Sequence, residues 1–173
     1  AMSEPTLHDR FHLIGIGGAG MSVVAELLAS RGAIVEGSDR EESAVLEHLR
    51  SVGVRTFVGH DASHVDATSV VVVSTAIRDD NPELAIARER GQLVIHRSQA
   101  LALAASGMRF VGVAGAHGKT TTSGMLAIAL SACGLDPSVA VGGVLPQLGT
   151  GAHLGGGDVF VAEADESDGS FLN

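Results

Sequence analysis

Residues 113–122 (VAGAHGKTTT) constrain the fold most, because they join an apolar run to a helical pattern through a glycine-rich turn. Apolar residues precede this segment from Phe110, and they recur at helical spacing after it as far as Leu130. Gly115 and Gly118 allow the backbone to approach an anion, and a helix that begins here offers unpaired N–H groups and the positive end of its dipole. We therefore predict a strand, a phosphate-binding loop and a helix, with a nucleoside triphosphate as the ligand.

The loop also carries side chains suited to a nucleotide. Lys119 adds a point charge, and a hydroxyl from Thr120 or Thr121 can bind Mg²⁺. The spacing G-x-x-G-K-T-T is shorter than a strict Walker A motif, which needs a glycine where Val113 stands. His117 either donates to a phosphate oxygen or simply fills the turn. The predicted phosphate-binding residues are Gly115, Ala116, His117, Gly118, Lys119, Thr120 and Thr121.

An acidic run follows the last apolar pattern. Residues 158–162 (DVFVA) predict a strand, and Glu163 comes directly after it, where a carboxylate can face the Mg²⁺ of a bound nucleotide. The alternative is a solvated acidic turn. Beside a phosphate loop we favour Glu163 as a metal ligand, together with Thr120. The glycine-rich residues 142–157 that precede this strand are predicted to be loop.

A second glycine-rich loop lies near the N-terminus. The apolar run 11–16 leads into G-x-G-x-x-G (residues 15–20) and a helical pattern, and the next short strand, 33–36, is followed by Asp39. A dinucleotide fold has this βαβ pattern, with phosphate at the helix start and the acidic residue near a ribose. Ser22 either assists phosphate binding or serves only the helix start. The pattern indicates a Rossmann-like unit and leaves its ligand open.

The rest of the N-terminal part continues the alternation of strands and helices. The run 69–73 (SVVVV) predicts a central strand buried on both faces, and the polar loop after it lies where ligands bind in such sheets. Ser43 and Asn81 are expected to cap helices. The remaining expected elements are strands at 54–58 and 93–95 and helices at 43–52, 82–91 and 101–106. The predicted fold class is α/β: a Rossmann-like parallel sheet over residues 1–107, then the truncated start of a P-loop ATPase domain at 108–173.

Composition excludes several kinds of partner. The net charge of −9 opposes binding along a nucleic-acid backbone, and an aromatic share of 3% leaves few platforms for stacked bases. No apolar run reaches the roughly 18 residues of a membrane span, and no signal peptide is visible at the start. The single cysteine, Cys133, fits a reduced cytoplasmic setting and is expected to be buried. The oligomeric state is not indicated.

Together these segments resemble the Mur ligase family. The resemblance covers nearly the whole chain, and its segments occur in family order. It implies an enzyme of three domains, of which this chain holds the UDP-binding Rossmann-like domain and the opening of the central ATPase domain, without the C-terminal domain. The segments are GIGGAGMS (15–22), GSD (37–39), STAI (74–77), DDNPE (79–83), GAHGKTTT (115–122) and EADESDGSF (163–171).

The resemblance implies ATP-dependent joining of L-alanine to the carboxylate of UDP-N-acetylmuramate through an acyl phosphate, in peptidoglycan synthesis. Lys119 would be the catalytic residue that neutralises the γ-phosphate, while Thr120 and Glu163 would hold Mg²⁺. The UDP substrate would contact the first glycine loop, the loop 74–77 and two charged residues. The full set is Gly17, Gly18, Ala19, Gly20, Met21, Ser22, Asp39, Ser74, Thr75, Ala76, Ile77 and Arg97.

Two positions depart from the family pattern, and other functions stay open. Ala116 stands where the family usually has threonine, and Gly151 where asparagine is often seen. One alternative is the recycling ligase that attaches a tripeptide to the same UDP sugar. A second is an NAD-dependent oxidoreductase, which the first glycine loop and Asp39 alone would suggest and the Gly-Lys-Thr-Thr loop disfavours. A third is a module that binds the UDP sugar without turnover; the chain by itself is expected to be inactive.

Overall fold

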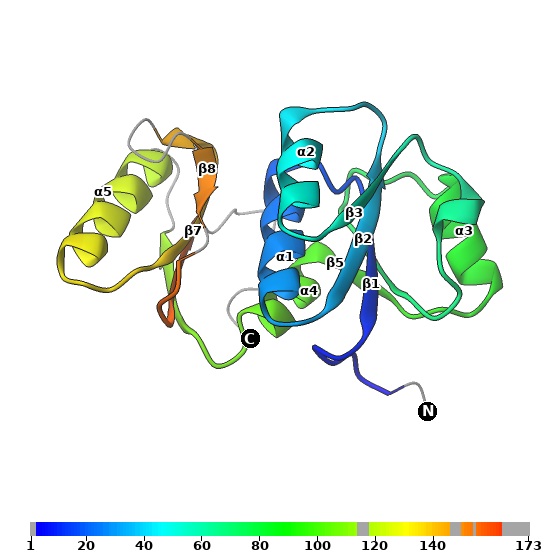
Figure 1. The fold of residues 1–173 in the computed structure, drawn as a ribbon, viewed down its shortest axis with the longest axis horizontal. Helices are drawn as coiled ribbons and strands as arrows, with labels where there is room; N and C mark the ends of the chain where they lie inside the picture. The colour runs from blue at the N-terminus through cyan, green and yellow to red at the C-terminus, as the bar shows by residue number, and fades with distance from the viewer. Residues whose placement is uncertain (1–2, 114–117, 146–149, 154, 164–173) are drawn as a thin grey trace. The chain divides into compact units, whose positions relative to one another are not determined.

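The computed structural model describes residues 3–113, 118–145, 150–153 and 155–163. Contacts divide the chain into two units, Ala1–Ala104 and Ala105–Asn173 (Figure 1). In the described residues the first unit contains a five-stranded sheet and the second a four-stranded sheet.

The first unit is built on a parallel sheet with strand order β3-β2-β1-β4-β5. This order makes β1 the central strand, whereas the apolar pattern predicted that place for β4. β4 lies between β1 and β5, so it is still an interior strand. The strands are β1 (Arg10–Ile14), β2 (Ile34–Asp39), β3 (Arg55–Val58), β4 (Val70–Val73) and β5 (Val94–His96).

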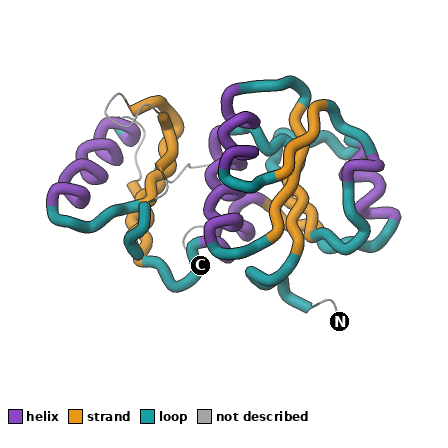
Figure 2. Tube along the Cα trace, in the orientation of Figure 1, coloured by secondary structure: helices purple, strands orange, loops and turns teal. Residues whose placement is uncertain are grey.

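Helices cover both faces of this sheet (Figures 1 and 2). One face carries α1 (Ala19–Ser30), α2 (Ala44–Ser51) and α4 (Arg97–Ala104). The other carries α3 (Pro82–Glu89) and the short 3₁₀ helix η1 (Ala62–His64). The two sides arise because the chain adds strands outward from β1 to β3 and then returns to add β4 and β5, and right-handed crossovers place the two sets of helices on opposite faces.

Local sequence signals set most helix starts. The Ser43 side chain accepts a hydrogen bond from the N–H of Leu46, and the Asn81 side chain accepts from the N–H groups of Glu83 and Leu84. Both caps were expected from the residue types. Helix α4 begins at Arg97, earlier than its apolar pattern predicted.

The early start of α4 has a side-chain cause. The N–H of His96 donates to Oε1 of Gln99 over 2.9 Å, and the His96 ring accepts from the N–H of Ser98 over 3.2 Å. These bonds pair donors that a helix start leaves without partners. The polar residues before the apolar run therefore belong to the helix.

The face of the sheet under α3 holds a compact apolar group. Ile14 from β1 and Val71 from β4 pack with Val65, Leu84 and Ala87. All five side chains are buried, with Leu84 only 2% exposed. This packing holds the N-terminal turn of α3, which contains Glu83, against the sheet.

In the second unit the described strands have the order β6-β9-β7-β8. β9 pairs in parallel with both β6 and β7, and β7 pairs with β8 in antiparallel orientation. Helix α5 (Lys119–Ala132) contacts β6, β7 and β9. The strands are β6 (Arg109–Val113), β7 (Ser138–Leu145), β8 (Thr150–His153) and β9 (Val159–Glu163).

The prediction of loop over residues 142–157 was wrong for much of that range, since it contains the end of β7 and all of β8. Val139 lies opposite His153 and Leu145 opposite Thr150, with a register shift between the two pairs. Antiparallel pairing satisfies backbone N–H and C=O groups whatever side chains are present, so glycine-rich sequence can still form a hairpin. Residues 146–149 and 154 of the range lie outside the described residues. Cys133, expected to be buried, is exposed at the end of α5.

Candidate functional site

The glycine loop between β1 and α1 is fixed by the end of β2. The N–H groups of Gly15 and Ile16 both donate to the main-chain oxygen of Ser38, over 2.8 and 2.9 Å. Gly15 has a φ of 79°, a conformation that favours glycine. A Cβ at Gly37 would collide with the carbonyl oxygen of Leu13, so β2 can lie this close only because residue 37 lacks a side chain.

Asp39 holds the next residue of the loop. Its Oδ2 accepts from the N–H of Gly17 over 2.8 Å, and its Oδ1 accepts from the N–H of Arg40 over 2.7 Å. The N–H of Gly18 then donates to the carbonyl oxygen of Gly15 over 3.1 Å. Asp39, predicted to lie near a ribose, therefore already binds two backbone donors. The loop amides as far as Gly18 are engaged within the protein.

The start of α1 is the part of this edge that faces solvent. Gly18 is the N-cap and provides no side-chain hydrogen bond, and the described first turn contains no acidic residue. Gly18 and Ala19 are exposed, whereas Met21 is buried. The Ser22 hydroxyl donates to the carbonyl oxygen of Ala19 over 3.1 Å, which is ordinary helix-start bonding. The backbone N–H groups of residues 19–21 are thus the donors best placed for a ligand.

Two residues distant in sequence lie against the same loop. A Cβ at Gly20 would overlap Nη1 of Arg97, so the guanidinium group lies at the first turn of α1. A Cβ at Gly15 would lie 3.4 Å from Cδ1 of Ile77. Ile77 belongs to the loop 74–77, in which residues 75 and 76 are exposed. The structure therefore brings together the glycine loop, Asp39, Arg97 and the loop after β4, which the family resemblance assigns to one substrate.

This edge is suited to an anion. β1 and β4 are neighbouring strands. The chain adds β2 and β3 on the far side of β1 and adds β5 on the far side of β4. Ligands usually bind at the carboxyl ends of two such strands in doubly wound sheets. The helix start contributes partial positive charge, and Arg97 adds a full one. A diphosphate group carries the charge and the acceptor oxygens that match these donors.

At the second predicted site the structure describes the backbone at the start of α5 and at the end of β9. Gly118 is the N-cap of α5 with a φ of 77°, so the helix begins at Lys119 as the pattern predicted. In the parallel pairing of β6 and β9, Val113 lies opposite Glu163. Glu163 therefore pairs with the last described residue before the predicted phosphate loop. Outside the described residues are Gly115, Ala116 and His117, and so are the side chains of Lys119, Thr120, Thr121 and Glu163, whose roles stay predictions.

Known proteins are similar to this chain in sequence and in architecture. Residues 10–109 match the Mur ligase family, catalytic domain. The chain belongs to the Mur ligase family. It is 58% identical over 168 residues to a UDP-N-acetylmuramate–L-alanine ligase of Streptomyces avermitilis, an alignment that covers 96% of this chain and 36% of the relative. The chain thus spans about a third of the length of such relatives.

Solved Mur ligase structures confirm the α/β fold of the chain. A UDP-N-acetylmuramate–alanine ligase of Thermotoga maritima is 34% identical with a TM-score of 0.79, and the match covers 90% of this chain and 37% of that one. A UDP-N-acetylmuramate:L-alanyl-gamma-D-glutamyl-meso-diaminopimelate ligase from Neisseria meningitides is 30% identical with a TM-score of 0.81. That match covers 95% of this chain and 55% of the other.

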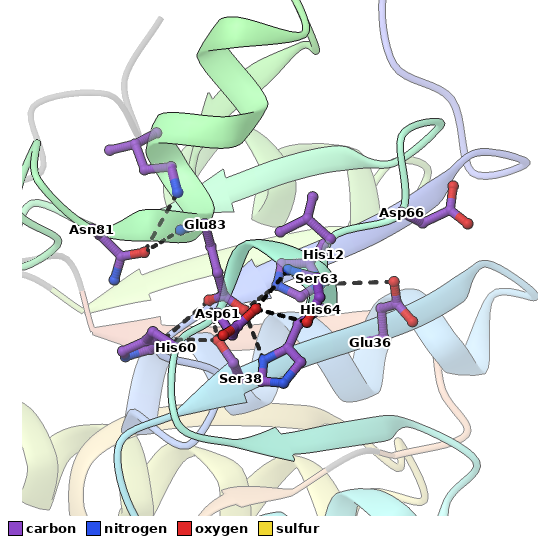
Figure 3. Close-up of polar contacts among 12 residues, drawn as sticks. His12, Glu36, Ser38, His60, Asp61, Ser63, His64, Asp66, Asn81 and Glu83 are labelled. Atoms are coloured by element: carbon purple, nitrogen blue, oxygen red, sulfur yellow. Dashed lines mark hydrogen bonds and ion pairs between the residues drawn. The ribbon is translucent and has the colours of Figure 1, made fainter.

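A buried polar cluster surrounds Glu83 on the α3 face of the sheet (Figure 3). It was not predicted from the sequence. Oε1 of Glu83 lies 3.2 Å from Nε2 of His12 and 3.4 Å from Nδ1 of His64. Oε2 lies 3.0 Å from Nδ1 of His60 and accepts from the Ser38 hydroxyl. We call these residues, with Glu36, the Glu83 cluster.

A signal for the Glu83 cluster was present in the sequence. His12, Glu36 and Ser38 are polar residues among the apolar residues of β1 and β2, and the pairing of these strands sets His12 opposite Glu36 and Ile14 opposite Ser38. Alternate residues of a strand share a face, so the three side chains lie on one face of the sheet. His60, expected to be a surface or satisfied histidine, is the latter.

Burial and ion pairing act in opposite directions on this cluster. Burial alone would lower the pKa of His12, but the carboxylates of Glu36 and Glu83 outweigh it and raise that pKa above 6.5. Burial alone would raise the pKa of Glu83, but hydrogen bonds from His12 and Ser38 outweigh it and lower that pKa below 4.5. Nδ1 of His12 faces Oε1 of Glu36 at 3.7 Å, an ion-pair distance.

These shifts predict a stability maximum in mildly acidic solution. The contribution of His12 is complete below pH 6.5 and is lost as pH rises through its raised folded pKa. The contribution of Glu83 to stability is present above pH 4.5 and is lost as pH falls through its lowered folded pKa.

Urea unfolding followed by circular dichroism should give a higher unfolding free energy at pH 6 than at pH 9. His12→Gln should flatten that slope and His48→Gln, at an exposed histidine, should not; equal slopes in all three proteins would refute the assignment.

The cluster does not form a metal site. Among the residues that the structure describes, no group of three or more His, Cys, Asp or Glu side chains has an arrangement that could hold a metal ion.

Within the same residues, none of the helices combines the length and the apolar character needed to traverse a bilayer.

Proposed function

We propose that this chain is the N-terminal part of a UDP-N-acetylmuramate–L-alanine ligase that acts in peptidoglycan synthesis in the cytoplasm. Residues 1–107 would bind the UDP part of UDP-N-acetylmuramate, and residues from 108 onward would begin the ATP-binding domain. The observation that carries this proposal is the guanidinium of Arg97 at the first turn of α1, beside a loop whose own amides are already bonded. A diphosphate placed there would meet one arginine and a helix start.

The same geometry disfavours the NAD-dependent oxidoreductase. In dinucleotide-binding folds the acidic residue after the second strand hydrogen-bonds the ribose of the cofactor. Here both oxygens of Asp39 accept from backbone N–H groups of Gly17 and Arg40. A ribose hydroxyl would have to compete with these bonds, which also hold the loop in place.

The ATP half of the proposal rests on the backbone of the second unit. ATP would supply the phosphoryl group that activates the muramate carboxylate before L-alanine attacks. The N–H groups of residues 115–121 would bind its phosphates, Lys119 would neutralise charge, and Thr120 and Glu163 would hold Mg²⁺. Two backbone features support this: α5 begins at Lys119, and Val113 pairs with Glu163 between β6 and β9.

The tripeptide-recycling ligase is the second candidate, because its Neisseria representative superposes as well as the alanine-adding enzyme does. Sequence identity favours the alanine-adding enzyme. The chain is 58% identical to an enzyme with that name and 30% identical to the recycling enzyme. We therefore assign L-alanine as the amino acid that the complete enzyme would use.

A thermal-shift comparison with UDP-N-acetylmuramate, NAD and Mg-ATP tests the proposal. A ligand at about 100 times its Kd adds about 2.7 kcal/mol to the unfolding free energy, which corresponds to a rise of several degrees in Tm for a unit of this size. We expect such a rise with UDP-N-acetylmuramate and none with NAD. A rise with NAD alone would overturn the ligase assignment in favour of the oxidoreductase.

A further inference from the structure

Glu83 is an unusual residue for its position. It lies in the first turn of α3, where Asn81 caps the helix through the N–H of Glu83 itself, over 2.9 Å. The cap and the packing of Leu84 already fix this turn. The Glu83 side chain nevertheless points into the protein and is fully buried. Burying a carboxylate carries a desolvation penalty that only close partners offset, so its retention calls for a specific role.

The partners of Glu83 come from separate segments of the first unit. His12 lies on β1, Ser38 on β2, His60 in the turn after β3 and His64 on η1. Figure 3 shows these four side chains converging on the one carboxylate. Because the contacts use both oxygens of Glu83, its position ties α3 to the central strands and to the segment that follows β3.

One of these contacts leads directly to the ligand edge. The Ser38 hydroxyl donates to Glu83, while the main-chain oxygen of the same residue accepts from the N–H groups of Gly15 and Ile16. The next residue, Asp39, holds the N–H of Gly17. Three successive loop amides therefore depend on the placement of residues 38 and 39.

A second connection runs through the turn after β3. The N–H of Gly59 donates to the main-chain oxygen of Asp39 over 2.7 Å, and the following residue, His60, contacts Glu83. The end of β2 is thus held to the cluster by Ser38 and by His60. No other carboxylate in the described residues makes both connections.

We propose that Glu83 is a positioning residue for the nucleotide-binding glycine loop: through Ser38 and His60 it fixes the end of β2, and β2 fixes the loop amides of residues 15–17. It does not touch the ligand. This inference rests on the proposed function for its ligand, the UDP sugar, but the order of the loop can be measured without any ligand.

Amide hydrogen exchange in the ligand-free chain gives the first test. We expect Glu83→Gln, which keeps the shape and removes the charge, to speed exchange at Gly15, Ile16 and Gly17 about ten-fold. The amide of Val71, which donates to Leu93, should change much less and reports opening of the whole sheet. Equal acceleration at Val71 and at the three loop amides would show a general structural role and overturn the proposal.

The affinity for UDP-N-acetylmuramate gives the second test, by isothermal titration. We expect the Kd to rise about ten-fold in Glu83→Gln. Leu49→Ala is the control, since it removes a fully buried side chain from α2 and leaves Glu83 and the turn that carries it unchanged. It should lower the Tm by several degrees and leave the Kd within about two-fold. An unchanged Kd in a folded Glu83→Gln chain would overturn the proposal.

Ser38→Ala is the second variant, and it decides the question if Glu83→Gln fails to fold. It removes only the hydroxyl link and keeps the main-chain oxygen that binds the loop. Faster exchange at residues 15–17 with normal exchange at Val71 would support the proposal, and unchanged exchange would refute it. If the parent chain does not bind UDP-N-acetylmuramate, the proposed function fails, while the exchange results still decide the role of Glu83.

Discussion

Gly37→Ala is expected to lower the unfolding free energy of the first unit by about 3 kcal/mol. The new Cβ would meet the main-chain oxygen of Leu13 and two side-chain atoms of Ile16 at 2.7 and 2.9 Å. Gly37 pairs with both Leu13 and Thr56, so β2 cannot move away without breaking a ladder on one side. Since total stabilities are of the order of 5–15 kcal/mol, this loss is large.

The midpoint of urea unfolding by circular dichroism measures this effect, since the chain has no Trp or Tyr for fluorescence. Gly17→Ala is the matched control. Its Cβ would meet Oδ2 of Asp39 at 2.7 Å, and a carboxylate at the end of a side chain can rotate away. We expect a loss of about 1 kcal/mol, mainly the bond between that carboxylate and the Gly17 amide. Equal losses for the two alanine variants would show that the close approach of β2 does not matter.

Arg97→Ala and Lys119→Ala are each expected to weaken the binding of a different one of the two proposed ligands. Loss of a charge-assisted bond to phosphate weakens binding by about 10- to 100-fold. Arg97→Ala should therefore weaken UDP-N-acetylmuramate binding and leave Mg-ATP binding unchanged, because the Arg97 guanidinium lies at the first turn of α1, at the proposed UDP site. Lys119→Ala should weaken Mg-ATP binding only, because Lys119 begins α5.

Isothermal titration of both ligands against each variant measures this separation. Arg97→Lys should give an intermediate loss, since lysine keeps the charge and lacks the planar fork that matches phosphate. Arg50→Ala controls for lost positive charge, because Arg50 pairs with Glu42 on the surface and belongs to neither proposed site. Equal loss of both ligands in either alanine variant would show that the two sites are wrongly assigned.

Much of the fold could be predicted from local signals. Glycine positions and alternating strand and helix patterns predicted the strands and α-helices of the first unit, because several helix starts there carry a local signal, such as the Asn81 cap. The central place of β1 could not be predicted from apolarity, since β1 carries His12 at a buried position. Strand order depends on long-range pairing, which a run such as 69–73 does not encode.

The candidate site divides in the same way. The glycine loop, Asp39, Arg97 and the loop 74–77 were predicted as a group, and the structure brings them together. The hydrogen bonds of Asp39 to the loop were not foreseen, since a carboxylate can bind a ribose or a backbone with the same atoms. The Glu83 cluster was missed because its members come from separate segments of the chain, and His12 meets His60 and His64 only in the folded unit.

His12 and Glu83 are separated by 71 positions in the chain, and Ser38 and Glu83 by 45. Chains emerge from the ribosome N-terminus first, so the glycine loop is synthesised well before α3. The β1-α1-β2 segment can form early from local contacts, yet the end of β2 obtains its buried carboxylate only when residue 83 has emerged. We therefore expect nucleotide-binding competence to appear only after residue 83 has emerged and α3 has docked, and nascent chains that end before α3 to lack it.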